Sequence, residues 1–143
     1  MAIPDPEPGL VINYAYLWHH EHLVGHEEGR KDRPSVIVLS VGSPGADGTL
    51  VMVLPVTHSE PPTGEGIEIP QAIKHNLGLD DERSWIVISE GNEFFWPGYD
   101  LRKRRKDNSY TYGFLPPRFF DRLVKAFVAW HETHSQGNVI SRD

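Results

Sequence analysis

The chain has 143 residues, of which 38% are hydrophobic and 24% are charged, and this is the size and composition of one globular domain with a packed core. It has no cysteine and no apolar run of ~20 residues, which excludes disulfides, thiolate metal sites and membrane-spanning helices. A net charge of −6 argues against non-specific coating of nucleic acid, although residues 102–106 alone carry five positive charges and leave −11 (−6 − 5) for the rest.

The first half of the chain reads as short strands separated by turn-forming residues, which predicts a mainly β core. Alternating apolar residues over 10–18 predict a first strand, and the polar stretch 19–33 predicts an exposed loop. The continuous β-branched run 35–41 is typical of a strand buried on both faces. Residues 50–56 form the returning strand of a hairpin whose tip is the glycine-rich segment 42–48.

The second half of the chain adds smaller elements and one longer helix. Residues 91–101 are rich in aromatic side chains, so we expect an irregular segment that packs on the sheet or on a partner subunit. After the pair Pro116-Pro117, apolar residues recur every three or four positions and predict a C-terminal helix. A short extended piece, a short helix ended by Gly78, a buried strand and a final strand are expected at 67–70, 71–77, 85–88 and 110–115.

We expect a single domain over residues 1–143, with flexible ends at 1–8 and 137–143. The first nine residues have neither the basic end nor the apolar stretch of a secretion signal. We therefore expect a cytoplasmic protein that makes no use of a membrane.

Two anchors, in this order along the chain, carry a family resemblance. The loop Gly25–Pro34 contains glycine and glutamate and ends in Arg-Pro before a Val/Ile strand, and Val53–Ser59 closes the next strand with a threonine-containing stretch. Together they resemble the MazF/PemK family of bacterial toxins over roughly residues 9 to 90. The resemblance implies an SH3-like β-barrel with a few helices, usually a homodimer, which cleaves single-stranded RNA without metal or another cofactor and is neutralised by an antitoxin protein.

Metal-free RNA cleavage uses the 2′-hydroxyl as nucleophile and needs a base, a cation for the phosphorane and a proton for the leaving oxygen. Arg33 matches the Arg-Pro anchor and can fork onto phosphate oxygens, unless it pairs with Asp32 or Glu28 and only orders the loop. Thr57 matches the strand-end threonine and can donate to phosphate, or it satisfies a turn amide. His58 titrates near neutrality and can serve as base or acid, or it is an exposed turn residue.

Further residues are candidates for binding RNA or for completing the acid–base chemistry. An asparagine suits a nucleobase edge, cations suit phosphate, and a glutamate, either Glu90 or Glu93, can act as a base. One histidine of the loop can supply the base instead, and the sequence does not choose among them. The nucleic-acid-binding candidates are Arg30, Lys31, Glu90, Asn92 and Arg102, and the loop histidines are His19, His20, His22 and His26.

One departure from the family leaves two rival interpretations open. Some family members place an Arg and an Asp after the strand that here spans 85–88, where this chain reads Ser-Glu-Gly-Asn. The absence of this Arg and Asp favours a non-catalytic relative that binds nucleic acid or protein, such as a regulator or a decayed toxin. A metal-dependent enzyme is the third possibility, because His22 and His26 have i, i+4 spacing beside Glu21, but Gly25 interrupts that helix and we expect no metal site.

Overall fold

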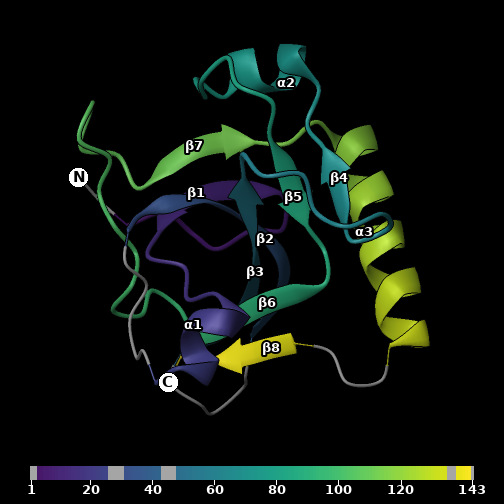
Figure 1. The fold of residues 1–143 in the computed structure, drawn as a ribbon. Coiled ribbons are helices and arrows are strands. Elements are labelled where there is room, and N and C mark those ends of the chain that lie inside the picture. Colours follow the sequence, from purple (N-terminus) through teal and green to yellow (C-terminus); the bar gives the residue numbers. More distant parts are fainter. Residues whose placement is uncertain (1–2, 26–30, 43–47, 135–137, 143) are drawn as a thin grey trace.

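A computed structural model describes residues 3–25, 31–42, 48–134 and 138–142. In this part of the chain the protein is mainly β, with eight strands and three helices (Figure 1). In chain order the elements are β1 (Leu10–Tyr14), α1 (His19–Leu23), β2 (Arg33–Gly42), β3 (Thr49–Thr57), β4 (Gly66–Glu68), α2 (Gln71–Asn76), β5 (Trp85–Val87), β6 (Glu90–Phe95), β7 (Thr111–Phe114), α3 (Pro117–Thr133) and β8 (Asn138–Ser141).

The strands form one sheet with β3 at its centre. The main path is β4-β5-β3-β2-β1-β7, and β6 pairs with the first half of β3 while β5 pairs with its end. The pairings are antiparallel except for the parallel pair of β6 with β8. The expectation of a mainly β fold is therefore confirmed. Among the described residues no ladder of hydrogen bonds joins the edge strands β4 and β7, so the sheet is not a closed barrel.

The central strands bury both of their faces, which explains their continuous apolar sequences. One cluster contains Val36 and Leu54 and packs under α3, and the opposite cluster contains Ile37, Val53 and Phe94. Because successive side chains of a strand point to opposite faces, β1, β2 and β3 contribute to both clusters. The prediction of burial for 35–41 is correct only as far as residue 38, since β2 then runs beyond the core.

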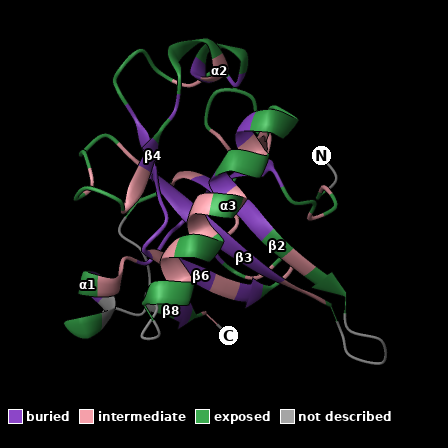
Figure 2. Cartoon of the chain, turned by 90° about the vertical axis from the view of Figure 1, so that its right-hand side faces the viewer, coloured by how far each residue is buried: buried purple, intermediate pink, exposed green. Residues whose placement is uncertain are grey.

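The C-terminal helix α3 begins at Pro117, as the sequence predicts. Phe119 and Leu123 are buried in the core, while Phe127 and Trp130 pack against it and are partly buried. Figure 2 shows the helix lying over the sheet, with exposed and partly buried residues along the side that faces the viewer. None of the described helices is both long and apolar enough to cross a lipid bilayer.

Three sequence predictions for local structure are wrong. The segment 91–101 is not irregular throughout, because residues 90–95 form strand β6 against β3. Gly91 permits this approach, since a Cβ there would lie 3.2 Å from the Val53 carbonyl oxygen. The loop 19–33 contains the short helix α1, whose Glu21 is buried.

The third wrong prediction is that the strand at 110–115 is the final one, because another strand follows α3. Residues 138–141 form β8, and the next residue, Arg142, anchors it. The Arg142 guanidinium lies 2.8 Å from an Asp100 carboxylate oxygen and donates to the Ala15 carbonyl over 3.1 Å. A buried ion pair joining segments so distant in sequence leaves no local pattern from which to predict it.

Candidate active site

A cavity of about 520 Å³ opens where β2 begins and β3 ends. Arg33 is the first residue of β2 and Thr57 is the last residue of β3, and both line this cavity. His58 and Glu90 line it too, the latter from the start of β6. The structure therefore gathers these four sequence-predicted site residues, together with Lys31, around one opening.

Arg33 is held from two sides. Its guanidinium carbon lies 4.8 Å from the centre of the Trp18 ring, and one terminal nitrogen donates a long hydrogen bond of 3.4 Å to the Val56 carbonyl. Burial lowers the pKa of Arg33, and the negative charges of Glu21 and Glu90 oppose that shift, so the side chain stays a cation.

The guanidinium of Arg33 keeps unused donor capacity. Its Nε–H is buried and has no hydrogen-bond partner among the described residues. A buried donor without an acceptor is costly and rare in folded proteins. An anionic oxygen in the cavity is the natural acceptor for such a group, because guanidinium forks match phosphate oxygens.

Glu90 is the carboxylate of the cavity. It accepts hydrogen bonds from the Tyr16 hydroxyl at 3.1 Å and from the His19 amide at 2.9 Å. Burial raises the pKa of Glu90, although these two hydrogen bonds oppose the shift. A carboxylate whose pKa is raised, at a cavity that also holds a cation, is suited to exchange a proton with a substrate.

The hydrogen bonding of Thr57 agrees with the structural interpretation, in which its side chain satisfies a turn amide. Its hydroxyl oxygen accepts a hydrogen bond from the Ser59 amide at 3.1 Å, which is the strand-end turn expected as the structural alternative. The hydroxyl proton remains able to donate toward the cavity. Thr57 can therefore close the turn and contact a phosphate oxygen at the same time.

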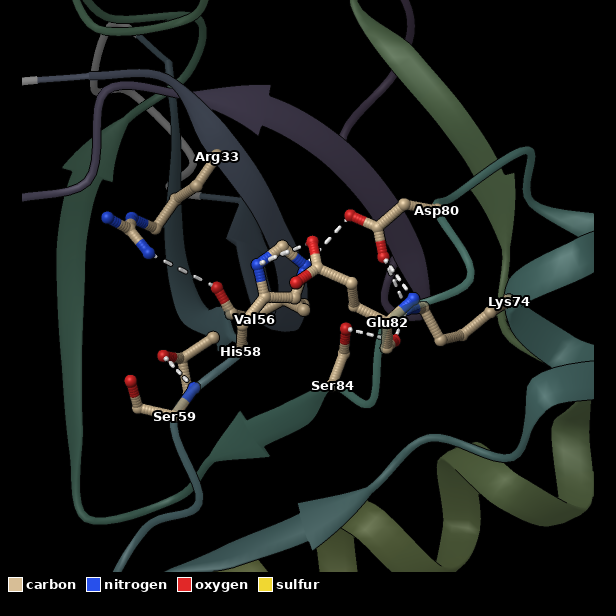
Figure 3. Close-up of polar contacts among 9 residues, drawn as sticks. Arg33, Val56, His58, Ser59, Lys74, Asp80, Glu82 and Ser84 are labelled. Atoms are coloured by element: carbon tan, nitrogen blue, oxygen red, sulfur yellow. Dashed lines mark hydrogen bonds and ion pairs between the residues drawn. The ribbon is translucent and has the colours of Figure 1, made fainter.

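His58 is turned toward the loop between α2 and β5. Its Nε2 lies 2.8 Å from an Asp80 carboxylate oxygen and its Nδ1 lies 3.7 Å from a Glu82 oxygen. Figure 3 shows the ring facing these carboxylates while the Arg33 guanidinium lies on the other side of the strand end. Because both ring nitrogens of His58 face these carboxylates, the ring would have to turn to take a proton from a substrate in the cavity, so the geometry favours Glu90 as the base.

Asp80 also holds a buried lysine. The Lys74 ammonium, whose side chain is 1% exposed, lies 2.7 Å from Asp80 and also donates to the Glu82 carbonyl. Burial tends to raise the pKa of Asp80, but the hydrogen bond from Lys74 and the charge of His58 outweigh burial, so the pKa of Asp80 is lowered. This cluster fixes the loop that leads to β5.

We expect Asp80→Asn to destabilise the protein at pH 7 by about 1–3 kcal/mol, because it leaves the Lys74 ammonium buried without a counter-charge. The folded-state pKa of Asp80 is lowered, so its contribution is complete above about pH 4 and is lost as the pH falls through that lowered value. Thermal unfolding of both proteins between pH 7 and 3 measures this difference. The exposed neighbour Asp81→Asn is the control, and an equal loss there would contradict the expectation.

The nucleic-acid-binding candidates lie in different places. Lys31 is exposed at the cavity edge, and Arg30 lies outside the described residues. Arg102 donates to the Tyr99 carbonyl and lies 4.0 Å from a carboxylate oxygen of Asp32, so it ties the entry of β2 to the segment after β6.

Asn92 is not part of the cavity. It is 0% exposed, and its side-chain amide exchanges two hydrogen bonds of 2.9 Å with the Leu17 backbone. Its oxygen also accepts from Arg142 at 3.2 Å. This position leaves no polar atom of Asn92 for a nucleobase, which corrects the expectation.

Trp18 and His20 are site residues that were not assigned from the sequence. Both line the cavity, and their rings stack with centres 6.2 Å apart. Trp18 ends the alternating apolar run of β1, and its position just before the histidine loop is the signal that marks it. His20 was one of four candidate histidines, and its place in the cavity wall distinguishes it.

The histidine pair proposed as a metal centre cannot be described, because His26 lies outside the described residues. Within the described ranges, His58, Asp80 and Glu82 offer three ligand atoms within 4.8 Å of one another. All three are exposed, and the Lys74 ammonium already contacts Asp80. These residues would hold a divalent ion only in competition with that ammonium.

Comparisons of the sequence with protein-family models and with curated proteins give no match. The resemblance to MazF/PemK toxins therefore stays a prediction that depends on the two sequence anchors.

Proposed function

We propose that the protein is an SH3-like endoribonuclease of the MazF/PemK type, which cleaves single-stranded RNA without metal and inhibits growth. The observation that supports it most is the shared cavity, in which Arg33, Thr57 and Glu90 meet. The cation, the hydroxyl and the proton acceptor that the chemistry needs come from three different strands. A helix packed on a mainly β core agrees with the same family.

In the proposed reaction, Glu90 takes the proton of the 2′-hydroxyl, and that oxygen attacks the adjacent phosphorus. Arg33 and the Thr57 hydroxyl stabilise the negative charge that builds on the phosphorane oxygens. The P–O5′ bond then breaks, and the leaving oxygen receives a proton from His20. The products are a 2′,3′-cyclic phosphate and a 5′-hydroxyl, and no redox change or cofactor is needed.

The direct test is incubation of the purified protein with a mixed-sequence single-stranded RNA in the presence of a chelator. We expect cleavage, with products that carry a cyclic phosphate and a 5′-hydroxyl. Activity that disappears with chelator and returns with a divalent metal would instead favour the metal-dependent interpretation. Intact RNA under all conditions would contradict nuclease function.

We expect Glu90→Gln to slow cleavage by about 10²–10⁴-fold, because the amide keeps the hydrogen bonds of Tyr16 and His19 but cannot take a proton. The wild-type rate should fall as the pH drops through the raised pKa of Glu90. Since burial disfavours the charged form, the variant should melt at the same temperature or about 2–4 °C higher at pH 8. Glu93→Gln on the same strand is the control, and an equal loss of activity there would contradict the assignment.

The proposal includes a homodimer and a cognate antitoxin protein in the cytoplasm, as the resemblance implies. Val41, Leu50 and Phe95 lie opposite one another on β2, β3 and β6, and therefore on one face of the sheet. Val41 and Phe95 are 48% and 42% exposed, so this face offers an apolar surface to a second copy. Light scattering on the purified protein tests the dimer.

A second candidate function is a non-catalytic nucleic-acid-binding relative. The absence of the family's Arg and Asp after β5, where the chain has Ser89 and Glu90, favours it. Binding of a non-cleavable RNA together with intact natural RNA would support this function over the nuclease.

A further inference from the structure

A second hollow of about 560 Å³ lies beside the candidate active site. Five cationic side chains line it, four of them from the segment between β6 and β7: Lys31, Lys103, Arg104, Arg105 and Lys106. Asp32 is its one lining carboxylate among the described residues. A protein whose net charge is −6 therefore concentrates positive charge on one hollowed surface.

Most of these cations are not neutralised by the protein. Arg104 lies 3.6 Å from Asp107 and 4.2 Å from the centre of the Tyr112 ring, so it belongs to the framework of the hollow. Lys103, Arg105 and Lys106 are exposed and have no carboxylate within ion-pair distance in the described part of the chain. Like charges gathered in this way repel one another and attract a polyanion.

The cationic segment is held in a fixed turn. The Arg104 amide donates to the Ser109 carbonyl at 2.8 Å, and the Asn108 amide donates back to Arg104 at 2.9 Å. Asn108 adopts φ 58, a left-handed conformation that asparagine tolerates better than most residues. In Figure 1 this segment runs along the left of the molecule, before β7. The backbone is thus shaped before any ligand arrives.

Lys31 connects the two hollows. It lines the cavity of Arg33 and Thr57 and also the cationic hollow, so the two form neighbouring parts of one surface. A chain bound at Arg33 can continue past Lys31 onto the cationic segment without leaving the surface.

We propose that the cationic hollow binds the phosphate backbone of single-stranded RNA next to the nucleotides in the candidate active site. This inference rests on the proposed function for the identity of the polyanion. Each lysine or arginine that contacts a phosphate releases a condensed counter-ion, so affinity gained here depends on salt. The lining of the hollow is mostly cationic, and contacts to phosphate carry no sequence information, so we expect the hollow to add affinity without sequence preference.

The test compares two variants of equal charge. Lys103→Gln, Arg105→Gln and Lys106→Gln together remove the three exposed cations of the hollow, while Arg118→Gln, Arg122→Gln and Lys125→Gln remove three exposed cations of α3. Binding is measured by fluorescence anisotropy with 2′-O-methyl RNA of twelve and of three nucleotides, which cannot be cleaved. Each titration is repeated from 50 to 300 mM salt.

For the twelve-nucleotide probe, the hollow variant should bind at least ten times more weakly at 100 mM salt. Its plot of log affinity against log salt should be less steep than that of the wild type by about 2, since each phosphate contact contributes about 0.7 for single strands. The three-nucleotide probe should bind equally tightly to the hollow variant and to the wild type. The α3 variant should bind both probes as tightly as the wild type does.

Unchanged binding of the long probe to the hollow variant, or an equal loss in the α3 variant, would overturn the inference. Tighter binding of an RNA duplex than of the single strand would overturn it as well. These outcomes are distinct from failure of the nuclease proposal, because the probes are not cleavable. If the wild-type protein binds these probes more tightly than the hollow variant but leaves natural RNA intact, the nuclease proposal is contradicted and the proposal that the hollow binds RNA is supported.

Discussion

Replacing Arg33 by alanine should slow RNA cleavage by a factor on the order of 10² or more, since it removes the cation that faces the developing phosphorane charge. The loss should appear in kcat more than in KM, because the interaction strengthens as negative charge builds on the transferred phosphate. Arg33→Lys should recover only part of the rate. An ammonium keeps the charge but lacks the planar fork and the stacking surface that Trp18 holds.

Arg83 provides a matched control for Arg33. It also stacks on a tryptophan, with its guanidinium carbon 4.9 Å from the centre of the Trp85 ring, and it pairs with Glu68 at 2.9 Å. It does not line the cavity. Arg83→Ala should cleave RNA at the wild-type rate. If Arg33→Ala and Arg83→Ala are both folded and lose similar amounts of activity, the loss reflects arginine–tryptophan stacking in general and not a role of Arg33 in the cavity.

The parts of the fold that sequence could predict are those with local patterns. The apolar runs of β2 and β3 and the helical spacing of α3 are visible within a dozen residues each. The two anchors also predicted that Arg33 and Thr57 lie near each other. They do so because β2 and β3 pair antiparallel, which brings the start of one strand to the end of the other.

The parts that sequence could not predict depend on partners far apart in the chain. In the sequence, His58 is simply a histidine at the end of a strand, and nothing near it indicates the contact with Asp80 that the loop between α2 and β5 provides. Glu90 reads as an acidic residue after a strand, and its pKa is raised by burial, against the hydrogen bonds that it accepts from the Tyr16 hydroxyl and the His19 amide. Periodicity carries no information about such contacts, because they depend on how separate elements pack.

The same long-range packing supports the site. Asn92 holds the Leu17 backbone, and Leu17 directly precedes Trp18, whose ring supports Arg33. Arg142 in turn donates to the Asn92 oxygen and to the carbonyl of Ala15. Arg142, which follows β8, thus contributes to the position of Trp18 through Asn92 and the Leu17 backbone.

Arg142→Met should therefore have the largest effect on stability, a loss of about 3–5 kcal/mol in the free energy of unfolding, because it removes the short ion pair of a nearly buried carboxylate and Arg102 lies farther from that carboxylate, at 4.0 Å. The Arg142 side chain is 3% exposed and that of Asp100 is 11% exposed, so solvent cannot replace the lost charge. Urea titration followed by tryptophan fluorescence measures the change. Arg122→Met, exposed on α3, should change stability by no more than about 0.5 kcal/mol.

The double variant Asp100→Leu with Arg142→Met separates loss of the ion pair from loss of packing. If the cost comes from breaking the ion pair with Asp100, removing Asp100 as well should recover much of the stability, since apolar side chains can replace a buried ion pair. The double variant should still bind RNA less tightly, because the hydrogen bonds from Arg142 to Asn92 and Ala15 are gone. A double variant as unstable as Arg142→Met alone would contradict this account, and would mean that the guanidinium acts mainly through its hydrogen bond to the Ala15 carbonyl.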